Sequence, residues 1–452
     1  MKLPKSPTLQ FSVSGLRGLY PEDINPQNLL AFVTAFSETL PPGEVALARD
    51  NRPSGEILEA LSIGILTALG RHVHVLGIVP TPSLKAYTRK KKLAGAIMIS
   101  ASHNPLPYNA LKFIGPGGFF FNEEQNQAWL RTLEKKPSYA RAPAIGKVRH
   151  VSLEEVADLH IEEILKALPC RLEGGMRLAL DPVCATLRRL GPYFLEKLGY
   201  ECVLINHEDK SDFPRAPEPS PHALAELAKI TKKKDCVAGF GFDPDGDRLA
   251  LASQEGVVLS EELTLPLVLR SALPKRPGAV VINLSTSWVS ESVAQSFRRK
   301  VYRTKVGEAH VVRQMQEVKA AMGGEGNGGV IDPKVASYGR DALTAMAHIL
   351  CLIQETKKTP YALSQEFPQL FMQKLSLKKE TQGSMKKIIS ALEKAFPHFQ
   401  KNQEDGLRLS HSSGVPWLHI RASNTEPIIR VIVEAQDERE LKNILDFIQN
   451  IR

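Results

Sequence analysis

Short apolar runs and amphipathic stretches alternate along most of the chain. Three stretches repeat one order, namely a β-rich run, a loop with Asp or Asn, a helical segment and a second β-rich run. The first runs are Val45–Ala48, Arg177–Pro182 and Ala279–Asn283, and the second runs are His72–Leu76, Glu201–Ile205 and Val301–Tyr302. Near-continuous apolar strands joined by amphipathic helices predict parallel βαβ units with helices on both faces of a sheet. Because the repeat has the size of a domain, it predicts three related α/β domains in tandem.

The last part of the chain follows another pattern. From about Phe367 onward, β-rich runs such as Ile428–Val433 are mixed with helical segments such as Met385–Ala395. This mixture predicts a fourth domain of the α+β class. The predicted domain limits are residues 1–148, 149–254, 255–364 and 365–452.

Composition excludes several classes of protein. Hydrophobic residues at 43% and charged residues at 24% are typical of globular chains, which excludes disordered and fibrous classes. No apolar run is long enough to span a bilayer, and Met1–Lys5 leads into mixed polar sequence, so we expect a cytoplasmic protein without membrane contact. The five cysteines are widely spread and never form a CxxC motif, which predicts neither a disulfide framework nor a structural zinc site.

The charge balance of the chain is positive. The 58 Lys and Arg residues against 49 Asp and Glu residues give a net charge of +9. The obvious basic runs, Arg89–Lys92 and Lys232–Lys234, each precede an apolar run, where solvated helix ends usually lie. Without interleaved aromatic residues or a nucleic-acid motif, these runs predict no nucleic-acid partner. A basic surface can also serve an anionic lipid or a phosphorylated small molecule, so the positions of the other cations matter more than the total.

The most informative segment is Gly241–Arg248. The apolar run Cys236–Phe240 leads into Asp243, Asp245 and Asp247, which stand at alternate positions on a loop with Pro and Gly. Three carboxylates this close repel one another unless a hard divalent cation lies among them, and oxygen-only ligands favour Mg²⁺ over zinc. The alternative is a solvated acidic turn.

A second segment, Ala96–Pro105, runs from an apolar strand into small hydroxyl residues. Ser102 is followed there by His103 on a loop at the carboxyl end of a strand, where open α/β sheets bind ligands. A serine in this place can be a nucleophile or a phosphate carrier. Lys112, further along, can supply an activating cation or a proton. An ordinary turn rich in Ser and Asn is the alternative.

Two later loops carry candidate substrate-binding residues. Arg421–Pro427 and the nearby Arg430 combine two arginines with hydroxyls and loop amides, which predicts a phosphate cradle, with an ordinary Ser/Thr turn as the alternative. In Gly323–Gly329, glycines permit close backbone approach, and Glu325 and Asn327 suit sugar hydroxyls. The glycine spacing does not match a nucleotide-binding P-loop.

Two arginine-bearing loops near the start are less specific. Ser12–Gly18 carries Arg17 between two glycines, and Arg49–Arg52 precedes a proline. Either loop can be structural, and in the second one Arg49 and Asp50 are expected to form a simple ion pair.

Together these segments resemble the α-D-phosphohexomutase family, which contains phosphoglucomutases, phosphomannomutases and phosphoglucosamine mutases. Ser100–Pro105 resembles its phosphoserine loop, Asp243–Arg248 its metal loop, Gly324–Gly329 its sugar-recognition loop and Arg421–Arg430 its phosphate-binding loop, and Ser14–Gly18 and Arg52–Gly55 also fit family patterns. The resemblance covers essentially the whole chain. It implies an α/β fold in which three tandem similar α/β domains with mixed sheets and a smaller C-terminal α+β domain surround a central cleft.

The chain departs from the usual family motifs in four places. Ala110 stands where many members have glycine, and Ser12-Val13 replaces Gly-Thr, but neither change removes a charge or a nucleophile. Asp181–Cys184 lacks the Asn-Gly that often follows in the second domain. Glu325–Gly329 replaces the form Glu-x-Ser-Gly-His, so any role of that histidine is unfilled. The sequence Glu-Gly-Asn-Gly-Gly that this chain has instead resembles the phosphoglucosamine and archaeal-type branches of the family.

The resemblance implies an intramolecular phosphotransferase, an isomerase that interconverts hexose 6-phosphate and hexose 1-phosphate through a phosphoserine and a bisphosphorylated sugar. The implied catalytic residues are Ser102, Arg248, Lys112, His103 and Arg17, the metal ligands are Ser102, Asp243, Asp245 and Asp247, and the substrate-binding residues are Glu325, Asn327, Arg421, Ser423, Asn424, Thr425 and Arg430. One Mg²⁺ per active site and a sugar bisphosphate as priming activator are implied as cofactors. The implied partner is a phosphorylated hexose, with no nucleic acid or membrane, and the protein is a monomer or a homodimer.

The sequence leaves more than one hexose phosphate as a candidate substrate. The loop sequence favours glucosamine phosphate, with mannose and glucose phosphates as the alternatives. A metal-dependent sugar phosphatase using the same serine, or an inactive sugar-phosphate-binding protein, is a further alternative.

Overall fold

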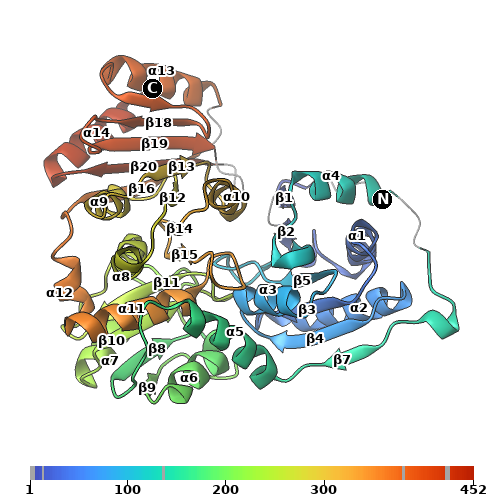
Figure 1. Cartoon of the computed structure of the whole chain (residues 1–452). Helices are drawn as coiled ribbons and strands as arrows, with labels where there is room; N and C mark the ends of the chain where they lie inside the picture. The colour runs from blue at the N-terminus through green and yellow to red at the C-terminus, as the bar shows by residue number, and fades with distance from the viewer. Residues whose placement is uncertain (1–5, 13–14, 135–137, 379–381, 423–427, 452) are drawn as a thin grey trace.

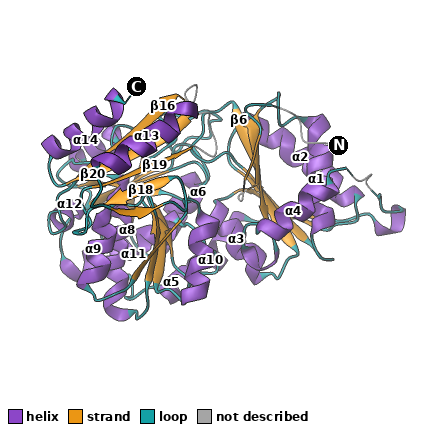
Figure 2. Ribbon diagram, turned by 90° about the horizontal axis from the view of Figure 1, so that it is seen from above, coloured by secondary structure: helices purple, strands orange, loops and turns teal. Residues whose placement is uncertain are grey.

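Four β-sheets follow one another along the chain, and each is packed with its own helices (Figure 1). The computed structural model describes residues 6–12, 15–134, 138–378, 382–422 and 428–451. The second, third and fourth units are stacked on one another, whereas the first unit lies to one side of the stack, as the view from above also shows (Figure 2).

The first unit contains a seven-stranded sheet with the order β1-β2-β6-β5-β3-β4-β7. Its strands are β1 (Gln10–Ser12), β2 (Gly15–Leu19), β3 (Val45–Arg49), β4 (Val73–Ile78), β5 (Gly95–Ile99), β6 (Tyr108–Ile114) and β7 (Val148–His150). Its helices are α1 (Pro26–Thr39), α2 (Pro53–Ala68), α3 (Thr81–Lys90) and α4 (Glu123–Thr132), with single 3₁₀ turns at Pro116–Gly118 and Ala142–Ala144. Strands β4, β3 and β5 are parallel, and β6 pairs with β5 in the antiparallel sense.

The second unit has a four-stranded sheet with the order β11-β10-β8-β9. Its strands are β8 (Arg177–Asp181), β9 (Glu201–Leu204), β10 (Ala238–Phe242) and β11 (Leu249–Ser253), and its helices are α5 (Leu153–Ala167), α6 (Leu187–Lys197) and α7 (Ala225–Lys233). Strands β9, β8 and β10 are parallel and β11 is antiparallel to β10. This arrangement repeats the four central strands of the first sheet.

The third unit has the order β13-β12-β14-β15. Its strands are β12 (Val280–Asn283), β13 (Val301–Thr304), β14 (Met322–Glu325) and β15 (Gly329–Ile331). Its helices are α8 (Thr264–Ala272), α9 (Trp288–Ser296), α10 (Glu308–Val318), α11 (Ala342–Thr356) and α12 (Pro360–Ser364), with 3₁₀ turns η3 (Glu261–Leu263) and η4 (Leu273–Lys275). Strands β13, β12 and β14 are parallel and β15 closes an antiparallel hairpin, so the predicted threefold α/β repeat is confirmed.

The fourth unit is smaller and differs in topology. Its five-stranded antiparallel sheet has the order β16-β20-β19-β18-β17. Its strands are β16 (Phe371–Lys378), β17 (Gln400–Asn402), β18 (Leu407–Ser410), β19 (Trp417–Ala422) and β20 (Ile428–Ala435), and its helices are α13 (Gln382–Ala395) and α14 (Glu438–Asn450). This is the predicted α+β domain.

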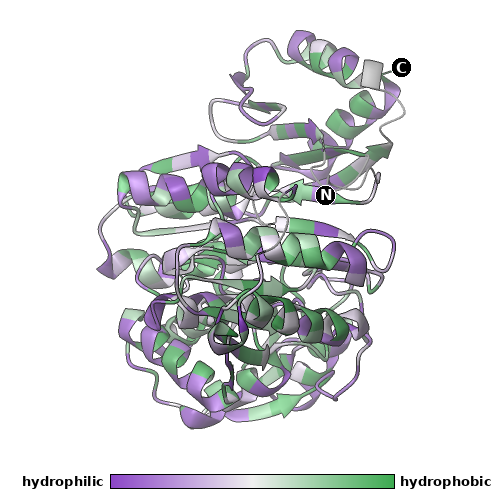
Figure 3. Ribbon diagram, turned by 90° about the vertical axis from the view of Figure 1, so that its right-hand side faces the viewer, coloured by the Kyte–Doolittle hydropathy of each residue, from purple (hydrophilic) through white to green (hydrophobic). Residues whose placement is uncertain are grey.

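The second and third units share one hydrophobic core. Side chains from α5 and β8 of the second unit belong to the same buried cluster as those of α8 and α11 from the third unit. Apolar residues accordingly concentrate on the strands and on the inner faces of the helices (Figure 3). Because burial of apolar surface drives packing, these two units are expected to act as one rigid body.

A disulfide joins the same two units. Cys170 and Cys351 are bonded, with Cα atoms 5.9 Å apart, because α11 packs beside the segment that follows α5. The expectation of no disulfide framework is therefore wrong for this pair, whose 181-residue separation leaves no spacing motif in the sequence. Cys184, Cys202 and Cys236 remain thiols. Across the described ranges, no helix is both apolar enough and long enough for a membrane crossing.

The shared core predicts that truncation of Leu350 on α11 destabilises the protein. Leu350 is fully buried, so Leu350→Ala removes apolar contacts and leaves a cavity, which should lower the free energy of unfolding by about 3 kcal/mol. Urea denaturation followed by circular dichroism measures this loss. As a control, Leu61→Ala at a 36% exposed position should lower it by about 1 kcal/mol or less. Equal losses in the two variants would contradict the account.

Candidate active site

The first three units each contribute one equivalent loop to the candidate site. The serine loop joins β5 to β6, the aspartate loop joins β10 to β11, and the glycine-rich loop joins β14 to β15. Each loop therefore closes the antiparallel hairpin that ends the four-strand repeat. The carboxyl ends of the parallel strands β5, β10 and β14 deliver the three loops, as is usual for ligand sites of open α/β sheets.

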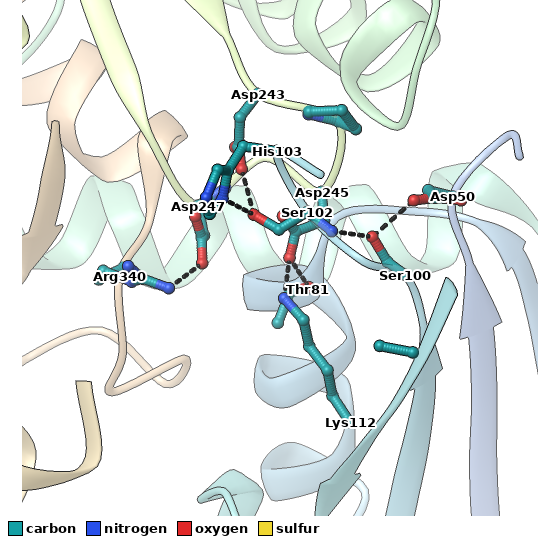
Figure 4. A network of polar contacts seen from close by, with 12 residues as sticks. Asp50, Thr81, Ser100, Ser102, His103, Lys112, Asp243, Asp245, Asp247 and Arg340 are labelled. Carbon is teal, nitrogen blue, oxygen red and sulfur yellow. Dashed lines mark hydrogen bonds and ion pairs between the residues drawn. The ribbon is translucent and has the colours of Figure 1, made fainter. Parts of the chain in front are cut away.

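Ser102 lies against the aspartate loop. Its Oγ donates a hydrogen bond of 2.8 Å to Asp243 Oδ2, and its amide donates to Ser100 Oγ at 3.0 Å (Figure 4). Ser100 in turn donates to Asp50 Oδ2 at 2.6 Å. Ser102 has a φ of 52°, in the left-handed region that non-glycine residues rarely occupy. Such strain, of order 1 kcal/mol or more, is typical of functional positions that the surrounding structure holds in place.

The buried guanidinium of Arg52 holds the backbone of this serine loop. Its Nε donates to Asp50 Oδ2 at 3.0 Å. Its other nitrogens donate, at 2.6–2.9 Å, to the carbonyl oxygens of Ser102, Asn104, Pro105 and Tyr108. The expected ion pair between Arg49 and Asp50 is wrong, because Asp50 faces inward to Arg52 and Arg49 pairs with Glu59 at 3.0 Å.

Three buried carboxylates form the centre of the site. One oxygen from each of Asp243, Asp245 and Asp247 lies within 4.8 Å of the others. Oδ1 of Asp245 and Oδ1 of Asp247 accept no hydrogen bond from the described residues. Burial, with the charges of Asp247 and Asp245, raises the pKa of Asp243 well above its usual value. Oxygen-only donors with vacant lone pairs and mutual repulsion fit a hard divalent cation such as Mg²⁺.

Two cations from other units face these carboxylates. Lys112 on β6 donates to Asp245 Oδ2 at 2.5 Å, and Thr81 Oγ1 donates to the same oxygen at 2.6 Å (Figure 4). Although burial alone would raise it, the charge of Lys112 lowers the pKa of Asp245. Arg340 donates to Asp247 Oδ2 at 2.6 Å. The aspartate loop is therefore bound to the first unit through Lys112 and to the third through Arg340.

Arg17 and His103 lie beside the serine. Arg17 Nη1 donates to Asn104 Oδ1 at 2.6 Å, and burial lowers its pKa to about 10. His103 Nδ1 lies 3.5 Å from Ser102 Oγ. Burial, with the nearby charges of Arg248 and Arg17, lowers the pKa of His103 well below its usual value, which favours the neutral ring.

Arg248 closes the aspartate loop. Its backbone amide donates to Asp243 Oδ1 at 3.1 Å, and its Nη1 pairs with Glu218 at 2.8 Å. Its Nε donates no hydrogen bond to the described residues and lies 3.7 Å from Asp247 Oδ1. One edge of this guanidinium is thus available to a bound anion.

The glycine-rich loop presents a fixed carboxylate. Glu325 accepts hydrogen bonds of 2.8–2.9 Å from Asn283 Nδ2, Gly307 N and Arg340 Nη1. A carboxylate has about four acceptor positions, so one remains for a ligand hydroxyl. Asn327 instead accepts from the amide of Gly329 at 3.2 Å, which stabilises the turn of its own loop.

The predicted phosphate-binding arginines of the fourth unit lie on two paired strands. Arg421 on β19 stands opposite Arg430 on β20, and Arg421 Nη1 lies 3.9 Å from Asp405 Oδ2. Asp405 also accepts from the amide of Val306 at 3.0 Å, which joins the fourth unit to the third. The predicted phosphate-binding residues of the connecting loop, Ser423, Asn424 and Thr425, lie outside the described residues.

Sequence reasoning missed Arg340, Thr81 and Glu308. Thr81 begins α3, and Glu308 begins α10. None of these residues belongs to a motif, and each meets its partner across a domain junction. Gly339, which directly precedes Arg340, is the nearest signal in the sequence.

Comparison with known proteins identifies all four units. Residues 8–140, 158–256 and 263–371 match the family descriptions "Phosphoglucomutase/phosphomannomutase, alpha/beta/alpha domain" I, II and III, and residues 380–451 match the C-terminal domain of the same family.

Curated relatives align along nearly their whole length. A Methanopyrus kandleri protein named "Probable phosphoglucosamine mutase" is 31% identical, with 98% of this chain and 97% of the relative covered. A "Phosphoglucomutase/phosphomannomutase" of Thermococcus kodakarensis is 30% identical, with 96% of both chains covered. A phosphoglucomutase/phosphomannomutase family protein of Burkholderia thailandensis has the same fold, with a TM-score of 0.84 at 23% identity, covering 99% of this chain and 97% of that one. The chain therefore belongs to the phosphoglucomutase/phosphomannomutase family of α-D-phosphohexomutases.

Proposed function

We propose that this protein is a phosphohexomutase that interconverts glucosamine 6-phosphate and glucosamine 1-phosphate through a phosphoserine at Ser102. The hydrogen bond of 2.8 Å between Ser102 Oγ and Asp243 carries the proposal, because it brings a nucleophilic hydroxyl to a cluster of three buried carboxylates. Several relatives are named phosphoglucosamine mutases or probable phosphoglucosamine mutases, which supports glucosamine as the sugar. That of Natranaerobius thermophilus is 27% identical, with 98% of both chains covered. The predicted cytoplasmic location and domain limits stay part of the proposal.

The proposed reaction consists of two phosphoryl transfers, one from Ser102 to the sugar and one from the other position of the sugar back to Ser102. Phosphorylated Ser102 gives its phosphoryl group to a free hydroxyl of the sugar monophosphate, so a serine P–O bond breaks and a sugar P–O bond forms. The hydroxyl proton passes to a neighbouring base, for which His103 and Lys112 are the candidates. The resulting sugar bisphosphate then presents its other phosphate to Ser102, which regenerates the phosphoserine and releases the isomer.

Other residues would bind the sugar hydroxyls and the two phosphate groups during these steps. Arg17 and Arg248 would bind oxygens of the transferring group, and Arg421, Ser423, Asn424, Thr425 and Arg430 would bind the phosphate that does not react. Glu325 would accept from the sugar hydroxyls in both orientations, with Asn327 beside it. A sugar bisphosphate would prime an enzyme that lacks its phosphoserine phosphate.

A Mg²⁺ ion suits the three carboxylates and Ser102. Asp243, Asp245 and Asp247 would hold it with one oxygen each. The ion would offset negative charge on the transferring phosphoryl group. A crystallised relative, the N-acetylphosphoglucosamine mutase of Aspergillus fumigatus, is described in complex with GlcNAc-6P and magnesium.

Replacement of the nucleophile should abolish the reaction. In Ser102→Ala, the loss of the only proposed phosphate carrier should lower mutase turnover at least about 1000-fold, measured by a coupled assay for glucosamine 6-phosphate. Intact-mass analysis should find no phosphate on this variant. Ser100→Ala, which changes the neighbouring buried hydroxyl, should still become phosphorylated. Full turnover in Ser102→Ala would refute the carrier.

Both removal of the metal and replacement of one proposed metal ligand should lower the activity. Treatment with a chelator should abolish turnover, and added Mg²⁺ should restore it. Asp245→Asn keeps the side-chain volume but removes a charged ligand, so half-maximal activation should need more than about 100-fold higher Mg²⁺. Asp158→Asn, on the exposed face of α5, serves as the control and should need the same Mg²⁺ as the unmodified protein. Equal Mg²⁺ requirements in the Asp245→Asn and Asp158→Asn proteins would contradict the assignment.

Three sugars separate the alternatives for the substrate. With the 6-phosphates of glucosamine, mannose and glucose, kcat/KM should be highest for glucosamine and little inorganic phosphate should appear. Equal values for the three sugars would contradict the preference. Release of inorganic phosphate at the rate of substrate loss would indicate the sugar phosphatase instead.

A further inference from the structure

One arginine outside every motif connects the two loops on which the proposed reaction depends. Arg340 lies between β15 and α11, and its side chain is 13% exposed. Its three guanidinium nitrogens each meet a different carboxylate: Nη2 donates to Asp247 at 2.6 Å, Nη1 to Glu325 at 2.9 Å and Nε to Glu308 at 3.3 Å. The rigid planar fork of arginine suits such a three-way contact, which a lysine ammonium cannot reproduce with the same geometry.

The three carboxylates come from three separate segments. Asp247 belongs to the aspartate loop of the second unit, Glu325 ends β14 of the third unit, and Glu308 begins α10. Glu308 also accepts from Lys85 of α3 in the first unit, at 2.6 Å. The five side chains therefore form one buried network that spans all three α/β units, with Arg340 as its centre.

Two glycines make room for this network. A Cβ atom at Gly329 would overlap Cδ of Arg340, and a Cβ atom at Gly339 would overlap Lys85 Nζ and Glu308 Oε1. The arginine stem thus occupies space that any larger residue at position 329 would fill. Among the described residues, neither glycine forms a hydrogen bond with the serine or the aspartates. Their small size therefore matters for the network around Arg340.

Arg340 also determines which oxygens stay available. It occupies Oδ2 of Asp247 and leaves Oδ1 without a hydrogen bond from the described residues. In the same way, Arg340 donates to Oε2 of Glu325, while Oε1 of Glu325 accepts hydrogen bonds from Asn283 Nδ2 and Gly307 N. One side chain therefore orients a metal-facing carboxylate and a sugar-facing carboxylate together.

We propose that Arg340 is a positioning residue that fixes the aspartate loop relative to the glycine-rich loop, and so sets the affinities for the metal and for the sugar jointly. This inference rests on the proposed function for its sugar but not for its metal. Side chains that support a metal ligand typically change metal affinity about 10–100-fold when they are replaced.

The test uses the full-length protein and Mn²⁺ as a probe whose free concentration is read by electron paramagnetic resonance, without sugar. Arg340→Lys should weaken Mn²⁺ binding about 10–100-fold. It should also raise KM for glucosamine 6-phosphate, because Glu325 loses the same partner. Gly329→Ala, which keeps the guanidinium but displaces its stem, should shift both quantities in the same direction.

Arg276→Lys is the matched control. Arg276 is also buried and pairs with Asp332 at 2.8 Å, but it contacts Met322 at the start of β14, away from the glycine-rich loop. The Arg276→Lys protein should unfold at a lower urea concentration but bind Mn²⁺ with unchanged affinity. This result would show that a loss of stability alone does not weaken Mn²⁺ binding.

Mn²⁺ affinities within about twofold of the unmodified protein in folded Arg340→Lys and Gly329→Ala would overturn the inference. If neither variant folds, Glu308→Gln decides, because it weakens the contacts of Glu308 with Arg340 Nε and Lys85 Nζ and leaves both ligand-facing carboxylates in place: weaker Mn²⁺ binding supports the inference and unchanged binding overturns it. An unmodified protein that binds Mn²⁺ but isomerises none of the three sugar phosphates would refute the proposed function alone.

Discussion

Repulsion among three buried carboxylates is the constraint on which the rest of the site depends. Oxygens of Asp243, Asp245 and Asp247 lie within 4.8 Å of one another, where each ionised pair repels by about 3 kcal/mol at the effective dielectric of a protein site. Lys112 and Arg340 offset part of this charge, and they come from the first and third units. Ion pairs with the aspartate loop therefore connect the first and third units to the second.

The threefold repeat explains how the chemistry is divided. Each α/β unit ends its four-strand core in the same antiparallel hairpin, and the three hairpin loops carry the serine, the aspartates and Glu325. One structural solution thus places the proposed nucleophile, the proposed metal ligands and the proposed sugar contact at equivalent positions. The predicted phosphate-binding arginines of the fourth unit lie on two paired strands, and Asp405 joins this unit to the third unit. In the proposed reaction, these arginines would bind the phosphate that does not react.

Features that are local in sequence were predictable, and features that depend on distant pairs were not. The βαβ repeats follow from runs such as Val45–Ala48, and Ser102 and the aspartates stand in contiguous motifs. Arg340 meets Asp247 across 93 residues, and Cys170 meets Cys351 across 181, so neither pairing has a spacing signature. Asp50 resembled a partner for Arg49 because they are adjacent, but burial directs it to Arg52.

A single-turnover chase tests the central claim most directly. Protein labelled with radioactive phosphate on Ser102 is mixed with unlabelled glucosamine 6-phosphate and Mg²⁺, and the label is followed by chromatography. Direct transfer predicts that the label leaves the protein and appears in sugar bisphosphate and then in sugar monophosphate. Label that stays on the protein, or that appears mainly as inorganic phosphate, would contradict phosphoryl transfer through Ser102.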